Sequence, residues 1–500
     1  MTPSLHAAQI AVTSLPIARS SHNVSRFFIS FVPFAFLLCG NLHALTGQEA
    51  EARLRMALQI ARETNDRALV AGVEKLGRDF KRAFPADAEE QVCKVEKSVG
   101  IDPGGWSMAG EPLFHPTQEM GGKLKAAKPK LDAAMKSDNA AAVREVTAEV
   151  IAILGDQAGV PDGRRAGRKV DATAWTMGEG QAVRLFMDAM KAEGPMVRGL
   201  SEGKMLPDTM ARTYAYILTG AVTARPFVEK HQPGDLAALD GLVRGVAGIL
   251  VKLQQPEGHF PFPDLRGKSI RFGDMIGKAM ADGKAEVRDG WVVTADPDGG
   301  TQFDTGLCGT SLLLAGKIYG SDEWKNAGLR AADWALGQQC CGNFNYNAFS
   351  VSLLANAARL TGGAKYLDGA LRKFRVGVAP GQAPNGRWLD SHNARTVYHV
   401  IIMRALGDPA VALPAEKRAE VESVAKPAVR AMLDEFDAMG VTVEALPELI
   451  TLANIFPGDT RLADSVKRLA VSIAAKCTDG KRVKMGASPH QLAALPLAMK

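Results

Sequence analysis

The sequence predicts an all-α protein in which helical hairpins repeat, and three observations support this. Apolar residues recur at helical spacing through most of the 500 residues. Strand signals are nearly absent, and residues 290–294 (GWVVT) form the one convincing short strand. A short motif recurs beyond residue 206 with a period of 42 to 44 residues.

With 46% hydrophobic and 23% charged residues, the composition excludes collagen-like and disordered proteins. The net charge of +6 is too small for a nucleic-acid footprint, so no nucleic acid is expected as a partner.

The N-terminal segment has the layout of a signal peptide. An apolar run of 12 residues, 27–38, follows two arginines and precedes small and polar residues. The run is too short to span a bilayer, so we expect export to the periplasm or the medium, cleavage near residues 44–47, and no stable membrane insertion afterwards. Residues 1–47 are therefore interpreted as lead-in and signal. Cys39 makes a lipoprotein the alternative, although Leu38 is a poor match to the small residue required.

The remaining chain divides into three parts. Residues 48–160 are rich in Ala, Glu, Lys and Arg at helical spacing and predict an N-terminal helical region. The stretch 161–205 begins with a polar, basic run and is interpreted as a connecting segment. The repeated motif falls within the third part, residues 206–500.

The cysteines predict no disulfide framework. Five remain once the signal is removed, an odd number in a chain that is large enough to bury a core. The adjacent Cys340 and Cys341 could form a metal or redox site, but burial as small apolar residues is the commoner role.

The motif is Gln-x3-Gly-x-Phe/Trp. It occurs at residues 254–260, 338–344 and 382–388, and the glutamines are 84 and 44 residues apart. Half of 84 predicts a further copy near residue 296, where Asp296, Gly300 and Phe303 form a degenerate match. We name these segments by their glycines: the Gly258, Gly300, Gly342 and Gly386 loops.

Each loop is expected to join two helices. The glycine allows the turn at a helix end, and the aromatic residue can fix the next helix to its neighbour. The unit is thus a helical hairpin, and such hairpins form either an open solenoid or a closed α/α toroid. Three later helices could complete a ring. The expected helices are 235–254, 304–319, 322–338, 347–360, 363–374, 391–406, 414–439, 443–455 and 460–476.

The Gln-x3-Gly-x-Trp/Phe motif resembles the repeat of the α/α toroids of terpene cyclases and protein prenyltransferases. The general layout of residues 206–500 is similar to the (α/α) barrels of polysaccharide lyases and glycoside hydrolases. This resemblance implies an α/α toroid behind the N-terminal helical region. A convincing C-terminal β-sandwich, which many toroidal lyases carry, is missing from the sequence.

Unusual polar residues gather in the predicted loops, which should open at the same end of a toroid. With Ser391 as N-cap, His392, Arg395 and His399 are expected on one helix face, a combination that suits an anionic ligand. The alternative is that Arg395 pairs with Asp390 and that the two histidines bond to loop carbonyls. The predicted catalytic residues are His392, His399, Arg395, Tyr346 and Asp304, and the predicted substrate-binding residues are His259, Asp264, Arg266, Asn345, Asn347, Trp388, Asp390, Asn393 and Tyr398.

Two mechanisms fit such an opening. β-Elimination of a uronate polymer needs a neutraliser for the carboxylate, a base for the neighbouring proton and an acid for the leaving oxygen. The sequence supplies Arg395 and Asn347 as neutralisers, His399 or His392 as the base, and Tyr346 or Tyr398 as the acid. These residue types resemble the Asn, His, Tyr and Arg chemistry of toroidal lyases, so cleavage of an acidic polysaccharide is the preferred function.

Two other possibilities stay open. Glycoside hydrolysis would use two carboxyl groups from Asp304, Asp264 and Asp390, although Asp304 could equally be a helix cap. A non-catalytic glycan-binding or scaffold protein would present Trp388, Phe260 and Phe344 as exposed platforms.

No cofactor or resident metal is predicted. The Asp-x-Asp-Asp proton donor of terpene cyclases does not occur. Asp304, Cys308 and His399 lack a recognisable zinc-ligand spacing. Ca²⁺ is the one ion that could assist, by neutralising substrate carboxylates.

Overall fold

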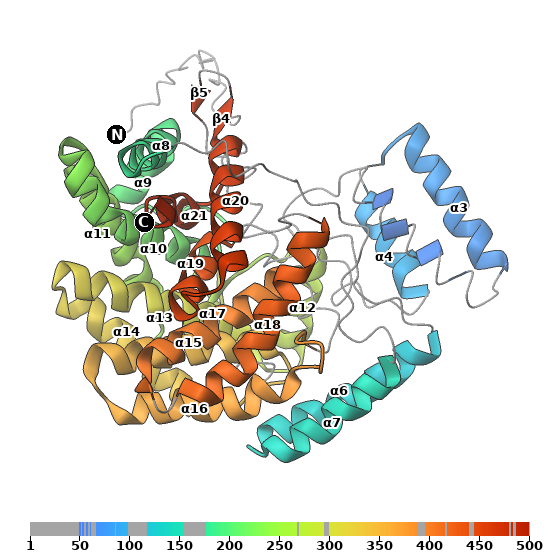
Figure 1. The fold of residues 1–500 in the computed structure, drawn as a ribbon. Helices are drawn as coiled ribbons and strands as arrows, with labels where there is room; N and C mark the ends of the chain where they lie inside the picture. The colour runs from blue at the N-terminus through green and yellow to red at the C-terminus, as the bar shows by residue number, and fades with distance from the viewer. Residues whose placement is uncertain are drawn as a thin grey trace, which may run out of the picture.

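The computed structural model describes an almost entirely helical protein (Figure 1). It covers most of residues 50–98, then 118–154, and then 177–499 apart from 268–269, 295–299, 389–395, 416–417, 440–444, 480–481 and 484–486. The all-α prediction is confirmed. The predicted signal segment lies outside the described residues.

The described N-terminal residues include two pairs of helices. Helices α3 (Arg67–Arg82) and α4 (Ala88–Ser98) belong to a small core of their own with residues such as Leu54 and Val92. Helices α6 (Gln118–Lys136) and α7 (Ala140–Leu154) form a hairpin, and their apolar residues join the main core of the protein. The second pair is therefore part of the larger unit, and we call it the arm.

Six helices form a closed inner ring. Each contacts the next, and the last returns to the first. Because inner and outer helices alternate along the chain, the inner helices all begin at one end of the ring, which we call the opening. The inner helices are α10 (Ala211–His231), α13 (Gly300–Tyr319), α15 (Phe344–Thr361), α17 (Thr396–Ala412), α19 (Leu446–Ile455) and α21 (Pro489–Ala494).

An outer helix covers each inner helix, so the fold is an α/α toroid. The outer helices are α11 (Leu236–Leu253), α14 (Asp322–Gly337), α16 (Ala364–Gly377), α18 (Arg418–Met439), α20 (Thr460–Cys477) and α8 (Glu179–Ala192). Helix α8 packs against α10 and α21 and completes the outer layer beside the C-terminus (Figure 1). The described part of the predicted connecting segment thus holds α8 and also α9 (Gly194–Ser201), which contacts α11.

The two layers differ in burial for a simple reason. An inner helix has neighbours all round, and every residue of α15 from Phe344 to Ala358 except Tyr346 is buried. An outer helix has one covered face. In α14, Trp324, Ala327 and Ala331 face the ring at helical spacing, whereas charged residues such as Glu323 are exposed.

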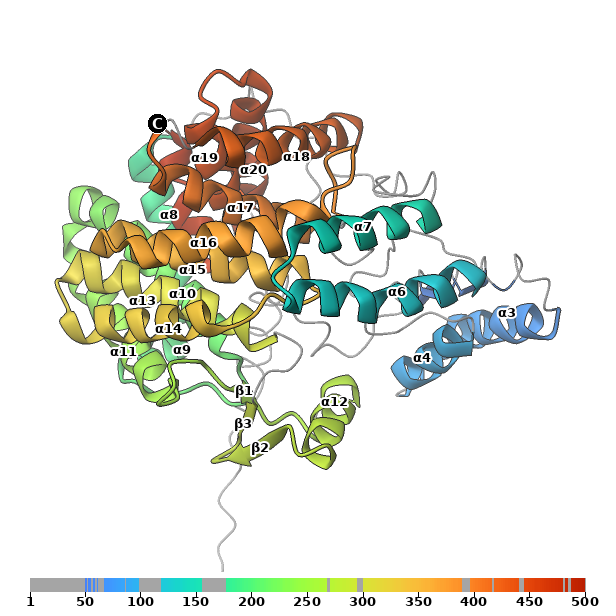
Figure 2. The ribbon, with the colours of Figure 1, turned by 90° about the horizontal axis from the view of Figure 1, so that it is seen from below.

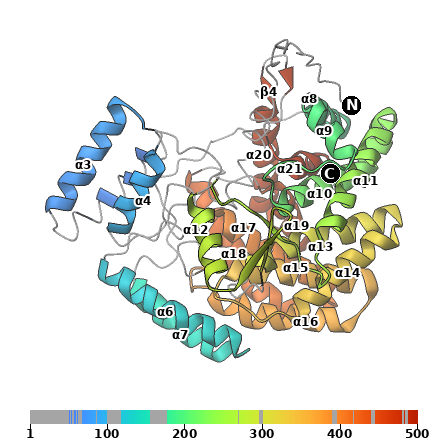
Figure 3. The same ribbon diagram turned by 180° about the vertical axis from the view of Figure 1, so that it is seen from behind.

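An insertion separates α11 from α13 (Figure 3). It contains β1 (Phe262–Pro263), α12 (Ile270–Ala281), β2 (Ala285–Arg288) and β3 (Trp291–Thr294), and the antiparallel sheet has the order β1-β3-β2. Val287 pairs with Val292, and β3 confirms the predicted strand. The expected hairpin between the Gly258 and Gly300 loops is wrong, because this insertion fills the interval. The Gly300 match is therefore not an independent repeat.

The remaining short elements connect the helices. They are η3 (Pro233–Asp235), η4 (Ala379–Gly381), the strand pair β4 (Thr478–Asp479) and β5 (Arg482–Val483), and η6 (Leu497–Met499). None of the described helices combines the length and apolarity needed to cross a membrane.

Candidate active site at the opening of the ring

The Gly258 and Gly386 loops have the same hydrogen bonds. The amide nitrogen Nε2 of Gln254 donates to the carbonyl of Gly258 (2.9 Å) and to that of Ala327 in α14 (2.8 Å). Likewise, Nε2 of Gln382 donates to the carbonyl of Gly386 (3.0 Å) and to that of Val424 in α18 (2.9 Å). Each glutamine therefore closes its own loop and ties it to the next outer helix.

The glycines of these two loops are required by space and by backbone conformation. Gly258 has φ +107° and Gly386 has φ +87°, which L side chains rarely adopt. A Cβ atom at either position would come closer than 3.0 Å to a backbone carbonyl of the next outer helix, that of Arg330 or Pro427. The loops can thus approach the outer helix only because they lack a side chain there.

The aromatic residues of the motif are structural. Phe260, Phe344 and Trp388 are 1%, 0% and 0% exposed, and the indole nitrogen of Trp388 donates to the carbonyl of Val378 (2.9 Å). These aromatic residues hold neighbouring helices together, which is the structural role that the motif predicts for them. The substrate-binding role predicted for Trp388 does not fit its burial, and the glycan-binding interpretation loses its exposed platforms.

Asp304 lies in the second turn of α13 and faces α10. Its two carboxylate oxygens accept from Nε and Nη2 of Arg212, both at 2.6 Å, and the pair is buried. The guanidinium of Arg212 also lies 3.9 Å from the ring centre of Phe303. Asp304 is therefore not a helix cap. It belongs to a buried ion pair between two inner helices at the opening.

His399 does not fit the role of base. Its side chain is fully buried between α17 and α18, where Nε2 bonds to the carbonyl of Ala428 (2.8 Å) and the ring lies 5.3 Å from that of Trp388. Burial, with the charge of Arg387, holds the pKa of His399 well below its usual value. A neutral imidazole that faces an outer helix cannot reach substrate at the opening.

The asparagines that begin α15 are also buried. Asn347 links three backbone segments: Nδ2 donates to the carbonyls of Cys341 (2.8 Å) and Gly377 (2.9 Å), and Oδ1 accepts from Cys341 N (3.0 Å). This placement makes Asn347 a support of the Gly342 loop rather than a neutraliser of substrate. Asn345 is 0% exposed.

The two predicted tyrosines differ. Tyr398 is buried, 1% exposed. Tyr346, the third residue of α15, is half-buried and packs edge to face against Phe303, with ring centres 6.0 Å apart. Tyr346 is therefore the predicted acid that the structure leaves accessible near the opening.

The other predicted residues before α13 are spread over two places. His259 is buried in the Gly258 loop, its ring 5.5 Å from that of Trp334, and burial lowers its pKa. Asp264 and Arg266 form an ion pair in the insertion, at 2.8 and 2.9 Å. Asp390, His392, Asn393 and Arg395 lie outside the described residues.

A polar cluster inside the ring was not predicted from the sequence. Nη1 of Arg404 lies 3.3 Å from Oε1 of Glu448, and the rings of Tyr216 and His490 are stacked 4.4 Å apart. Burial raises the pKa of Glu448, and burial together with Arg404 holds that of His490 well below its usual value. The sequence offers no signal for this cluster, because each residue stands alone in an apolar helix.

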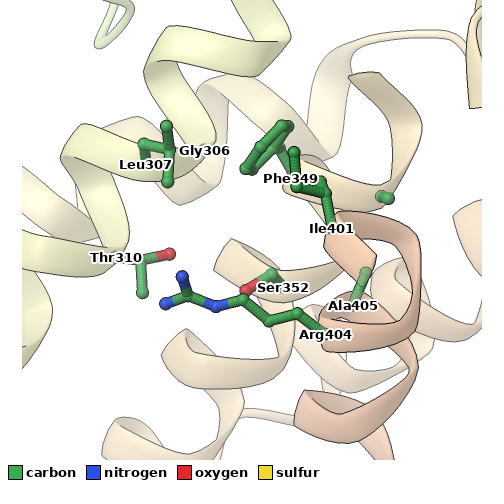
Figure 4. Close-up of a pocket in the computed structure, with 9 residues that line it drawn as sticks. Gly306, Leu307, Thr310, Phe349, Ser352, Ile401, Arg404 and Ala405 are labelled. Carbon is green, nitrogen blue, oxygen red and sulfur yellow. The ribbon is translucent and has the colours of Figure 1, made fainter. Parts of the chain in front are cut away.

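The cluster borders a small cavity between α13, α15 and α17. Arg404 extends toward the hydroxyl groups of Thr310 and Ser352 (Figure 4), and Ser352 in turn donates to Asp408. The cavity volume is about 10 Å³, enough for a single water molecule. This cavity is too small to hold a sugar.

A second buried group missed by the sequence analysis is Lys373 on α16. Its Nζ donates to Oε1 of Gln302 (2.9 Å), which also accepts from the hydroxyl of Ser350 (2.8 Å). Burial lowers the pKa of Lys373 to about 8.

Within the described part of the chain, no group of three or more His, Cys, Asp or Glu residues is arranged to hold a metal ion.

The comparisons with known proteins give no family. No family model matches the chain, and no curated protein matches it. Among solved structures, it is similar to cellobiose 2-epimerase from Spirochaeta thermophila, with 11% identity over 59% of this chain and 87% of that chain and a TM-score of 0.39. This likeness is too loose to support an assignment of function.

Proposed function

We propose that the protein is an exported carbohydrate-active enzyme that cleaves an acidic, uronate-containing polysaccharide by β-elimination at the opening of the ring. The observation that carries this proposal is the common direction of the six inner helices, whose N-termini gather at one end. Helix N-termini carry partial positive charge and unpaired N–H groups, so their convergence favours an anionic substrate.

The reaction needs three roles, and residues predicted from the sequence can fill them. Arg395, which immediately precedes α17, neutralises the substrate carboxylate and so acidifies the adjacent C–H. His392 takes that proton, and the electron pair forms a carbon–carbon double bond as the bond to the leaving oxygen breaks. Tyr346 donates its phenolic proton to that oxygen. The buried Arg212–Asp304 pair holds α10 and α13 together at the opening.

Hydrolysis is supported less well. It needs one protonated and one ionised carboxyl group on either side of the glycosidic bond. The carboxylate oxygens of Asp304 and Asp264 accept hydrogen bonds from Arg212 and Arg266, respectively. Neither is arranged as a proton donor.

The test is ultraviolet absorbance during incubation of the purified mature protein with a panel of uronate polymers. β-Elimination creates a conjugated double bond that hydrolysis does not. We expect absorbance to rise, and Arg395→Ala and His392→Ala each to slow the rise roughly a hundredfold or more. Arg461→Ala is the control. Arg461 lies at the start of the outer helix α20, where it pairs with Asp434, and its loss should leave activity unchanged. New reducing ends without absorbance would replace the lyase with a hydrolase.

A further inference from the structure

We infer that one face of helix α6 forms a positively charged wall beside the opening and binds the acidic polymer beyond the bond that is cleaved. The identity of the polymer rests on the proposed function. The wall consists of Lys125, Lys128 and Lys136, all exposed.

The arm is attached to the toroid at the opening. Oδ1 of Asp132 accepts from Gly342 N (2.9 Å), and Asp138 pairs with Arg372 of α16 (3.0 Å). Helix α7 contacts α16 and η4, which leads into the Gly386 loop. The arm therefore lies over the Gly342 and Gly386 loops, where inner helices begin (Figure 2).

Helical geometry places the three lysines on the side of α6 that meets this end of the ring. At 3.6 residues per turn, Lys125, Lys128 and Lys136 all lie within about 40° of Asp132, the residue bonded to the Gly342 loop. They extend along about 16 Å of the helix axis. Lys130 points to the other side, where it pairs with Glu149 of α7 at 2.7 Å.

The charge on this face is not balanced by the acids beside it. The bond of Asp132 to a backbone N–H does not cancel its formal charge, so three lysines share this face with one carboxylate, whereas Asp138 is paired with Arg372. Two further acids of the arm, Glu145 and Glu149, belong to α7, and Glu149 pairs with Lys130. A row of exposed cations next to an opening that favours anions suits a polymer with regularly spaced carboxylates.

The test compares two triple variants of equal net charge. K125A/K128A/K136A removes the wall, whereas K130A/K317A/K426A removes exposed lysines from the other face of α6, from α13 and from α18. Binding to polygalacturonate is measured by titration at several salt concentrations. We expect the wall variant to bind roughly tenfold more weakly with a shallower salt dependence, and the control variant to change less than about twofold.

Kinetics separate this inference from the proposed function. On the long polymer, the wall variant should raise KM and leave kcat unchanged, and on a short oligosaccharide it should match the unaltered protein. If no uronate polymer gives absorbance, the proposed function fails, yet a selective loss of binding in the wall variant still supports the wall. Equal weakening by both triple variants would overturn it. Equally tight, wall-dependent binding of duplex DNA would also overturn it, by making the partner a nucleic acid.

Discussion

The Gly258 and Gly386 loops and the Gly342 loop have the same motif but different structures. In the first two, the glutamine ties the loop to the next outer helix and the glycine has positive φ. In the Gly342 loop, Nε2 of Gln338 donates to the carbonyl of Trp334 in its own helix (3.3 Å), and Gly342 lacks the positive φ of the other two glycines. Its backbone N–H bonds instead to Asp132 of the arm.

This difference shows that one motif can meet two requirements. In the Gly258 and Gly386 loops, glycine allows the backbone to approach an outer helix of the toroid itself. In the Gly342 loop, glycine leaves room for a side chain from the arm, because a Cβ atom there would come closer than 3.0 Å to Oδ1 of Asp132. Substitutions of the same residue type should therefore have unlike effects in the two kinds of loop.

The largest effect is expected from Gly386→Ala. The new Cβ combines an unfavourable φ with a backbone clash against Pro427, which together should cost about 2–5 kcal/mol of unfolding free energy. Gly362→Ala is the matched control, because Gly362 has φ +67° but open space around it, and should cost about 1–2 kcal/mol. Thermal unfolding followed by circular dichroism measures both. If the two variants lost the same unfolding free energy, the backbone near Pro427 of α18 would have shifted to relieve the clash.

An intermediate effect is expected from the glutamines. Gln382→Leu leaves two carbonyls, those of Gly386 and Val424, without their donor and should cost about 1–3 kcal/mol. Gln338→Leu removes one long bond within its own helix and should cost under about 1 kcal/mol. Denaturant unfolding of the two variants gives the difference, and a larger loss for Gln338→Leu would contradict it.

The sequence was most informative about helices and their repeat. Residues 322–338 were predicted as a helix and Asp322–Gly337 forms one, because an outer helix has the polar and apolar faces that a periodic pattern reveals. The completion of the outer layer by α8 was missed, since α8 and its partner α21 are far apart in sequence and neither has the motif. The insertion was missed because its length happens to match the repeat.

The site was harder to predict for a physical reason. A toroid buries its inner helices on every side, so the sequence has no polar and apolar contrast that separates the face toward the ring axis from the face toward the outer layer. His399 was therefore assigned to the opening, although it faces α18. Arg404 and Glu448, which meet inside the ring, were not singled out for the same reason.

The smallest effect on the toroid, and the sharpest test of the comparison, is expected from Gly342→Ala. The added Cβ meets Asp132 of the arm. The arm should therefore detach while the unfolding free energy of the toroid changes by less than about 1 kcal/mol. Hydrogen exchange should accelerate in residues 118–154 and stay slow in 344–361.

Asp132→Asn is the matched control, because the amide keeps an oxygen that can accept from Gly342 N, and it should leave exchange in the arm unchanged. A loss of stability in Gly342→Ala as large as that of Gly386→Ala would mean that the Gly342 loop needs its glycine for the toroid itself. Slow exchange throughout the arm of Gly342→Ala would instead mean that Asp132 does not hold it. The two results would contradict the comparison in different ways. A large loss of stability would mean that the Gly342 loop does not differ from the Gly386 loop, and slow exchange in the arm would mean that the difference does not come from the contact with Asp132.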